Sequence, residues 1–188
     1  ITARGVPEEK IEYWPQYAES CYYPVNKENV TIDAIPQDGI LNLTFAGNIG
    51  YAQGLELLPQ LACKLKDKDK RVRFNLIGDG RYKQTLISEI EDLSVMEYFN
   101  FIDRQPPEKI KKYMALSDAS LILLSKHKLF ELYIPAKVQS SLACGIPIIG
   151  SISGETKRII DGAGIGYCSE AGDLEGLYQN ISKFSDLS

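Results

Sequence analysis

The sequence predicts an α/β protein with a Rossmann-like, doubly wound parallel sheet of about six strands. From residue 40 onward, short apolar runs alternate with segments whose apolar residues recur at helical spacing. Most of the runs carry apolar residues on both faces, which agrees with a sheet covered by helices on both faces. Strands that alternate with helices pair in parallel through right-handed crossovers. The 188 residues are enough for one domain with its own core.

The elements follow from local patterns. Leucines at helical spacing after residue 54 predict the first helix, and a lysine–aspartate tail at 64–70 closes it. Pro107 fits the first turn of a helix, and Gly145 is typical of a helix end. The predicted strands are 40–46, 72–77, 98–102, 119–124, 147–149 and 166–168. The predicted helices are 55–65, 81–93, 107–116, 135–143, 155–160 and 173–184.

The first 39 residues differ from this pattern. Four prolines and a group of aromatic residues indicate an extended, turn-rich lead-in. We expect the aromatic side chains to pack residues 1–39 onto the body formed by 40–188, or alternatively to face a domain junction. These aromatic residues are Tyr13, Trp14, Tyr17, Tyr22 and Tyr23. Because the chain starts at Ile1 rather than at methionine, we expect it to be a piece of a longer protein.

Composition excludes several classes of protein. The chain has 21 basic and 25 acidic residues, a net charge of −4, whereas nucleic-acid-binding proteins usually carry a basic excess. A single histidine, His127, excludes a histidine-rich metal site, and the four cysteines are scattered without metal-ligand spacing. No apolar stretch approaches the roughly 18 residues of a membrane span. We therefore expect no metal, no cofactor and no nucleic-acid partner.

A ligand of such a sheet binds beyond the carboxyl ends of the strands. The loop after the first strand holds three glycines in eight residues and precedes a helix, which favours a phosphate cradle over a plain tight turn. Its candidate phosphate-binding residues are Gly47, Asn48, Ile49, Gly50 and Gln53. The loop after the second strand adds Gly78, Asp79 and Gly80 as candidates, although Lys83 replaces the last glycine of the dinucleotide fingerprint.

The long loop after the fourth strand carries charged residues toward the same edge of the sheet. It includes Lys126, His127, Lys128, Glu131 and Tyr133. Lys137 follows in the first turn of the next helix, where a cation is unfavourable for the helix dipole, so an anionic partner would explain it as well as simple solvation does. No serine or cysteine nucleophile can be assigned beside His127. We interpret Asp103 and Arg104 as solvated or capping residues.

Six fragments in order resemble the C-terminal, nucleotide-sugar-binding domain of GT-B glycosyltransferases of family 4, the group 1 transferases. The resemblance spans nearly the whole chain, and residues 142–149 are its most specific part. The fragments are residues 5–15 (GVPEEKIEYWP), 45–47 (FAG), 76–80 (LIGDG), 99–101 (FNF), 113–119 (YMALSDA) and 142–149 (LACGIPII).

The chain departs from this family at its charged positions. Asn48 and Gln53 stand where many members place an arginine and a lysine on the donor pyrophosphate. Ser140 replaces one of the family's paired glutamates, and Glu131, nine residues before it, is the candidate catalytic residue. The pattern is similar to that of a bacterial subgroup that adds amino sugars such as N-acetyl-fucosamine. In this interpretation Lys137 provides the positive charge that binds the donor phosphates.

The resemblance implies a retaining glycosyltransferase that uses a nucleoside-diphosphate sugar, without a metal, in the synthesis of bacterial surface polysaccharides. It implies a donor-binding domain at 40–188, inactive alone, with an N-terminal acceptor domain lying outside this chain. It also implies a cytoplasmic enzyme, peripheral on the inner membrane face, with a lipid-linked glycan acceptor. One alternative is a non-catalytic Rossmann-like binding or regulatory domain with a degenerate site. Another is a UDP-GlcNAc 2-epimerase, which a single histidine argues against.

Overall fold

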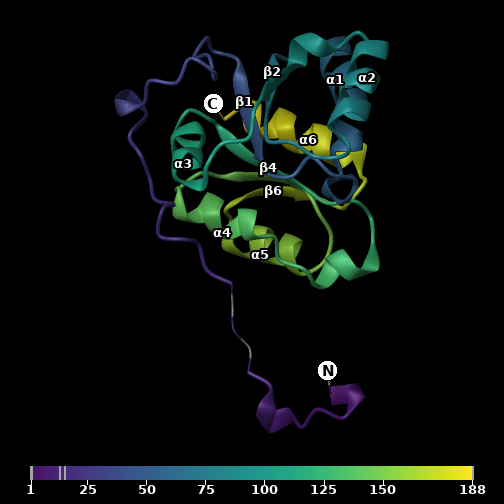
Figure 1. Ribbon diagram of the computed structural model, residues 1–188. Coiled ribbons are helices and arrows are strands. Elements are labelled where there is room, and N and C mark those ends of the chain that lie inside the picture. Colours follow the sequence, from purple (N-terminus) through teal and green to yellow (C-terminus); the bar gives the residue numbers. More distant parts are fainter. Residues whose placement is uncertain (1, 13, 15, 188) are drawn as a thin grey trace.

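A computed structural model describes residues 2–12, 14 and 16–187, and its centre is a six-stranded parallel sheet (Figure 1). The strands are β1 (Leu41–Ala46), β2 (Val72–Ile77), β3 (Phe99–Ile102), β4 (Ala119–Leu123), β5 (Ile148–Ser151) and β6 (Gly166–Ser169). Their order is β3-β2-β1-β4-β5-β6, so the chain reverses its direction of progress between β1 and β4. The doubly wound parallel class predicted from the sequence is confirmed.

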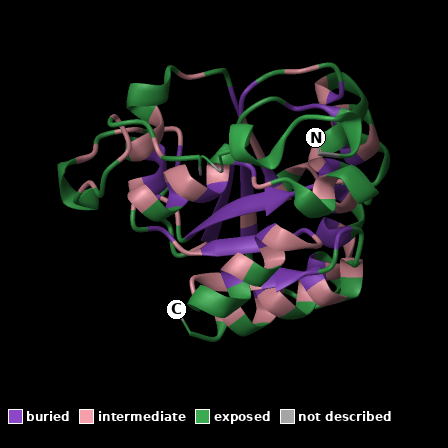
Figure 2. Cartoon of the chain, turned by 90° about the horizontal axis from the view of Figure 1, so that it is seen from below, coloured by how far each residue is buried: buried purple, intermediate pink, exposed green. Residues whose placement is uncertain are grey.

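Helices cover both faces of the sheet. The helices α1 (Leu58–Asp67), α2 (Lys83–Asp92) and α6 (Leu174–Ser185) lie on one face, and α3 (Pro107–Ala115), α4 (Ala136–Ala143) and α5 (Glu155–Ala163) lie on the other (Figure 1). Burial is greatest in the strands between the two layers, where Leu43, Phe45 and Phe74 are fully buried (Figure 2). Removal of this apolar surface from water is the main stabilising contribution. Within the described residues, no helix is both long enough and apolar enough to span a bilayer.

The predicted elements are present, with shifts of a few residues at their ends. The predicted helix at 55–65 divides into a 3₁₀ turn, η5 (Leu55–Leu57), and α1, because Pro59 lies in the first turn of α1, where a missing N–H costs nothing. The strand β5 continues to Ser151 and α5 to Ala163, both beyond their predicted ends. Gly164 then ends α5 in the left-handed conformation, at φ 63°.

A ladder of asparagines crosses the first three strands, inside a sheet that the sequence predicts to be apolar. The Asn75 side chain donates to Asn42 Oδ1 at 3.1 Å, and Asn100 donates to Asn75 Oδ1 at 2.8 Å. Asn42 also donates to the carbonyl of Pro36 at 3.1 Å. These amides, buried at Asn42 and Asn75 and partly buried at Asn100, therefore satisfy one another and attach the end of the lead-in to the sheet.

The lead-in does not pack as a whole. Residues 3–12 are all exposed and extend away from the body (Figure 1), and Trp14 and Tyr17 are 77% and 73% exposed. The predicted packing on the body is therefore wrong for Trp14 and Tyr17, which no described residue buries, whereas Lys111 Nζ of α3 lies 3.7 Å from the centre of the Tyr23 ring; Tyr13 and Pro15 lie outside the described residues. Only the later part is anchored, through partly buried Tyr22 and through Ile35, which packs with α3.

We predict that Asn75→Ala destabilises the fold by about 2–3 kcal/mol, because it removes two buried hydrogen bonds and leaves the partner groups less satisfied. Chemical denaturation measures the free energy of unfolding. Asn29→Ala is the control, since Asn29 is exposed at the end of η3 (Lys27–Asn29), and it should change stability by less than about 0.5 kcal/mol. Equal stability of the two variants would contradict a structural role for the ladder.

Candidate functional site

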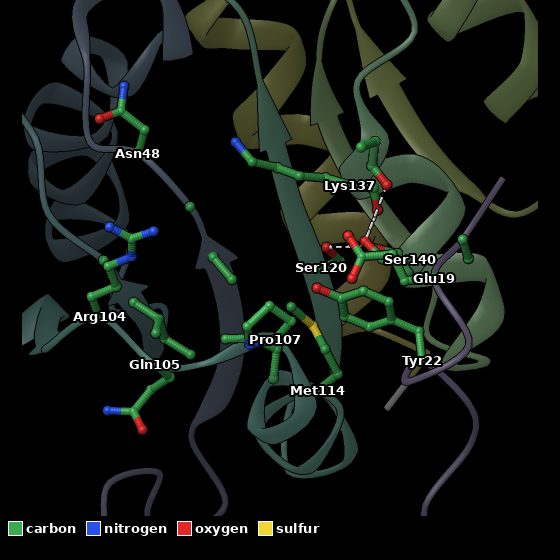
Figure 3. Close-up of a pocket in the computed structure, with 18 of the residues that line it drawn as sticks. Glu19, Tyr22, Asn48, Arg104, Gln105, Pro107, Met114, Ser120, Lys137 and Ser140 are labelled. Carbon is green, nitrogen blue, oxygen red and sulfur yellow. Dashed lines mark hydrogen bonds between the residues drawn. The ribbon is translucent and has the colours of Figure 1, made fainter. Parts of the chain in front are cut away.

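A cavity of about 460 Å³ lies at the carboxyl end of the sheet, at the point where the strand order reverses. Its walls come from the loops after β1, β2 and β3, from α3 and α4, and from residues 16–19 and 22 of the lead-in (Figure 3). This is the place where open α/β sheets bind ligands, as the sequence predicts.

Two glycine loops meet through their backbones at the floor of the cavity. Gly78 has φ 142°, and a Cβ there would lie 1.9 Å from the carbonyl oxygen of Gly47. A Cβ on Gly80 would lie 2.2 Å from the carbonyl oxygen of Ile49. This close approach allows the N–H of Gly47 to donate to Ile77 at 2.9 Å and that of Ile49 to donate to Asp79 at 2.8 Å. Glycine is therefore required here because the two backbones touch.

The predicted phosphate cradle at residues 47–50 has fewer free backbone N–H donors than its glycines suggest. The N–H groups of Gly47, Ile49 and Gly50 already donate to backbone carbonyls. Ile49 is fully buried and does not line the cavity. Within the described part of the chain, only the N–H of Asn48 lacks an acceptor in this stretch, and Asn48 does line the cavity.

Lys137 brings a cation to the same place. Its Nζ donates to Gln53 Oε1 and lies 4.0 Å from the centre of the Phe45 ring. A Cβ on Gly47 would lie 2.9 Å from Lys137 Cε, so the glycine makes room for the lysine. Burial lowers the pKa of Lys137 to about 7. No carboxylate of the described residues pairs with this amine, which is therefore ready for an anionic ligand.

The first turn of α4 adds backbone donors beside Lys137. Pro135 precedes the helix, and the N–H of Val138 donates to its carbonyl at 2.9 Å. The N–H groups of Ala136 and Lys137 belong to the first turn and have no helical acceptor. Both residues line the cavity. These two N–H groups, the N–H of Asn48 and the Lys137 amine form what we call the anion pole.

A polar wall faces the anion pole from one turn further along α4. The Ser120 and Ser141 hydroxyls are hydrogen-bonded at 2.8 Å, and Ser140 Oγ donates to the carbonyl of Ala136 at 3.1 Å. Glu19 and Tyr22, both from the lead-in, lie on this side of the cavity (Figure 3). Burial raises the pKa of the Tyr22 phenol, with smaller contributions from Cys21 and Glu19. The sequence gives no signal for these two residues, because the lead-in has no periodic pattern.

The third wall comes from the loop after β3. Arg104 and Gln105 line the cavity across from Glu19 and Ser140, beside Pro107 at the start of α3 (Figure 3). The interpretation of Arg104 as only a solvated or capping residue misses this placement. Its position two residues after the end of a predicted strand is the available signal, since the carboxyl ends of parallel strands share one edge.

The loop after β4 stays apart from the cavity. Glu131 is exposed on η7 (Lys128–Leu132) and is not among the lining residues that the structure describes, so its catalytic role stays a prediction. His127 accepts a hydrogen bond from the N–H of Leu129 at 3.2 Å and so caps η7. Across residues 2–12, 14 and 16–187, no three histidine, cysteine or acidic side chains gather as metal ligands.

Comparison with known sequences gives one family and two curated relatives. The sequence model of the family described as glycosyl transferases group 1 matches residues 34–188. N-acetyl-alpha-D-glucosaminyl L-malate synthase of Bacillus anthracis is 29% identical over 102 residues, which are 54% of this chain and 25% of the relative. The putative colanic acid biosynthesis glycosyltransferase WcaL of Escherichia coli is 22% identical over 150 residues, which are 78% of this chain and 36% of the relative.

Solved glycosyltransferases share the fold. WaaG, a glycosyltransferase involved in lipopolysaccharide biosynthesis, matches 97% of this chain over 49% of its own, with a TM-score of 0.75 and 12% identity. HepE of Anabaena, in complex with UDP-glucose, matches 77% of this chain over 38% of its own, with a TM-score of 0.64 and 16% identity. This chain therefore spans from a quarter to about half of the length of the relatives named here.

We predict that Lys137→Met stabilises the unliganded chain by about 2 kcal/mol at pH 6, because it removes a partly buried charge that has no carboxylate partner among the described residues. The unfolded chain keeps the lysine proton up to its ordinary pKa of 10.5, whereas the folded chain releases it above about 7. Wild-type stability therefore gains up to about 1.4 kcal/mol per pH unit in that window, so the advantage of the variant shrinks above pH 7 and reverses toward pH 10.

Thermal and urea unfolding in phosphate-free buffers at pH 6, 8 and 10 measure this difference. Lys109→Met is the control, because Lys109 is exposed on α3. A stability difference between Lys137→Met and wild type that is independent of pH would contradict the assignment of a buried cation.

Proposed function

This chain belongs to the group 1 glycosyl transferases, and we propose that it is the donor-binding domain of a retaining glycosyltransferase that uses a uridine diphosphate sugar. The observation that carries the proposal is the anion pole at the switch point, where Lys137 lacks a carboxylate partner among the described residues. The complex of HepE with UDP-glucose, on the same fold, supports the choice of nucleotide.

The cavity has the size and polarity of a nucleotide site. Its volume of about 460 Å³ lies within the roughly 300–1,000 Å³ of small-molecule sites. A diphosphate at the anion pole would place the nucleoside along α4, toward the polar wall and the loop that carries Arg104 and Gln105. The base would then lie against Pro107 and Ile110, which provide an apolar surface.

The chemistry that follows is leaving-group stabilisation. Cleavage of the bond between the sugar and the diphosphate leaves negative charge on the phosphate oxygens. The Lys137 amine and the first N–H groups of α4 would stabilise that charge, and partial burial strengthens the interaction. In this proposal Lys137 replaces the arginine and lysine that Asn48 and Gln53 do not provide, with the Gln53 amide holding the amine in place. Glu131 remains the predicted residue on the sugar side.

The proposal extends to the whole protein. An N-terminal domain would bind the acceptor, which we propose to be a lipid-linked glycan of surface polysaccharide synthesis, at the cytoplasmic face of the membrane. The similarity to WcaL, a putative colanic acid biosynthesis glycosyltransferase, supports a polysaccharide product. The donor sugar would be an amino sugar of the N-acetyl-fucosamine type, because of the pattern around the first glycine loop and Lys137.

Three positions that carry charged residues in many members of the family have uncharged side chains here. This favours a second candidate function, that of a non-catalytic binding domain. Asn48, Gln53 and Ser140 would then mark a site that has lost its donor. The two candidates differ in nucleotide binding, which the first experiment tests.

We predict that the chain binds UDP with saturable heat in titration calorimetry, and that GDP and ADP bind more weakly. The diphosphate interacts with the anion pole in each case, and the base side of the cavity provides the discrimination. Ligand-observed NMR extends the measurement to millimolar affinity. No saturable binding of any of the three would favour the degenerate-site candidate.

We predict that Lys137→Met weakens the binding of a UDP-sugar by about 1.5–3 kcal/mol at pH 6.5, the range for hydrogen bonds to charged groups. A UDP-sugar is used because its phosphates do not titrate near neutrality. Binding of the anion favours protonated Lys137, so wild-type affinity is greatest below pH 7 and falls as the pH rises above the pKa of about 7. The Lys137→Met variant should show a flat pH profile, and Lys109→Met should follow the wild type.

We predict that the 188-residue chain folds cooperatively but transfers no sugar alone. Orientation of donor against acceptor contributes up to about 7–11 kcal/mol in well-placed systems, and one wall of a cleft does not supply it. A thermal melt tests folding, and a transfer assay on a lipid-linked acceptor, with and without the rest of the protein, tests activity. Sugar transfer by this chain alone would refute the proposal that the acceptor domain lies elsewhere.

A further inference from the structure

A carboxylate from the lead-in enters the polar side of the cavity. Glu19 lines the cavity with Tyr22 and Ser140, and its side chain points toward them (Figure 3). No basic side chain of the described residues forms an ion pair with it, and its one hydrogen bond there is a weak contact of 3.9 Å from Cys21 Sγ. A free carboxylate in an anion-binding cavity would repel the ligand unless the ligand offers it hydrogen-bond donors.

The geometry of α4 indicates which part of the ligand lies beside Glu19. The anion pole is formed by the first turn of α4, and Ser140 lies one turn further on, a rise of about 5–6 Å. In a nucleoside diphosphate the group next to the phosphates is the ribose. A diphosphate at the pole therefore places the ribose, with its two hydroxyl donors, beside Ser140, Ser141 and Glu19.

The serine hydroxyls of this wall already donate their protons to acceptors within the protein. Ser140 Oγ donates to the carbonyls of Ala136 at 3.1 Å and Lys137 at 3.2 Å. Ser141 Oγ donates to Ser120 Oγ at 2.8 Å in a buried pair. Of the carboxylates that line the cavity, Asp79 uses its Oδ1 to accept from the N–H of Gly80 at 2.8 Å, on the opposite side. Glu19 is thus the strong acceptor available to the ribose.

We propose that Glu19 accepts hydrogen bonds from the ribose 2′ and 3′ hydroxyls of the donor nucleotide and makes the site specific for ribonucleotides. This rests on the proposed function, because it needs a nucleoside diphosphate at the anion pole. A carboxylate has two acceptor oxygens and no donor, which matches a vicinal diol that offers two donors. Residues 16–19 and 22 therefore form part of the donor site.

The test is titration of the wild-type chain and of Glu19→Gln with UDP and with 2′-deoxy-UDP. Wild type should bind UDP about 10-fold or more tightly than 2′-deoxy-UDP, the range for hydrogen bonds to charged groups. Glu19→Gln should lose about 10-fold in UDP affinity, whereas its affinity for 2′-deoxy-UDP should be unchanged or higher because a repulsive charge is gone. Glu12→Gln, an exposed position outside the cavity, should behave as wild type.

The outcomes separate this inference from the proposed function. Equal wild-type affinity for UDP and 2′-deoxy-UDP, or a Glu19→Gln variant that keeps wild-type discrimination, overturns the role of Glu19 and leaves nucleotide binding intact. Absence of any UDP binding by wild type overturns both. A thermal melt of each variant verifies folding, which exposed Glu19 should not affect.

Discussion

The site depends on one backbone contact, the packing of the β2 loop at Gly78 against the β1 loop at Gly47. A Cβ at Gly78 would lie 1.9 Å from the Gly47 carbonyl oxygen, so only glycine allows the loops to share their hydrogen bonds. Because Gly47 also lacks a side chain, the Lys137 side chain can pass over it from α4 and donate a hydrogen bond to Gln53. The absence of side chains at Gly47 and Gly78 thus allows both the contact between the two loops and the position of the Lys137 amine.

The charged groups of the cavity are arranged as expected for a site that binds a charged ligand. Lys137 contacts an aromatic ring and an amide rather than a carboxylate, and burial lowers its pKa to about 7. Such an arrangement costs stability, and proteins keep costly polar groups mainly where function uses them. The same holds for Glu19, whose carboxylate lies free on the opposite wall. Opposite charges at two ends of one cavity match a ligand with an anionic end and a hydroxylated middle.

The lead-in has two parts with different roles. Its first residues extend from the body, whereas residues 16–19 and 22 border the cavity and Ala34 and Pro36 accept hydrogen bonds from the asparagine ladder. The ladder joins β1, β2 and β3 through their side-chain amides. Burial of these amides in mutual hydrogen bonds fixes where the lead-in ends and the sheet begins.

The sequence by itself determined the strands, the helices and their alternation, because those depend on the spacing of neighbouring side chains. It also predicted Gly47, Asn48, Gly78, Asp79 and Lys137 as site residues, since glycine after a strand and a cation at a helix start are local signals, and all five line the cavity. Only the tertiary structure decided that Ile49 is core, that Glu131 lies outside the cavity, and that Glu19 and Arg104 enter it. Those placements arise from contacts between segments about 30 to 120 residues apart, which no local pattern encodes.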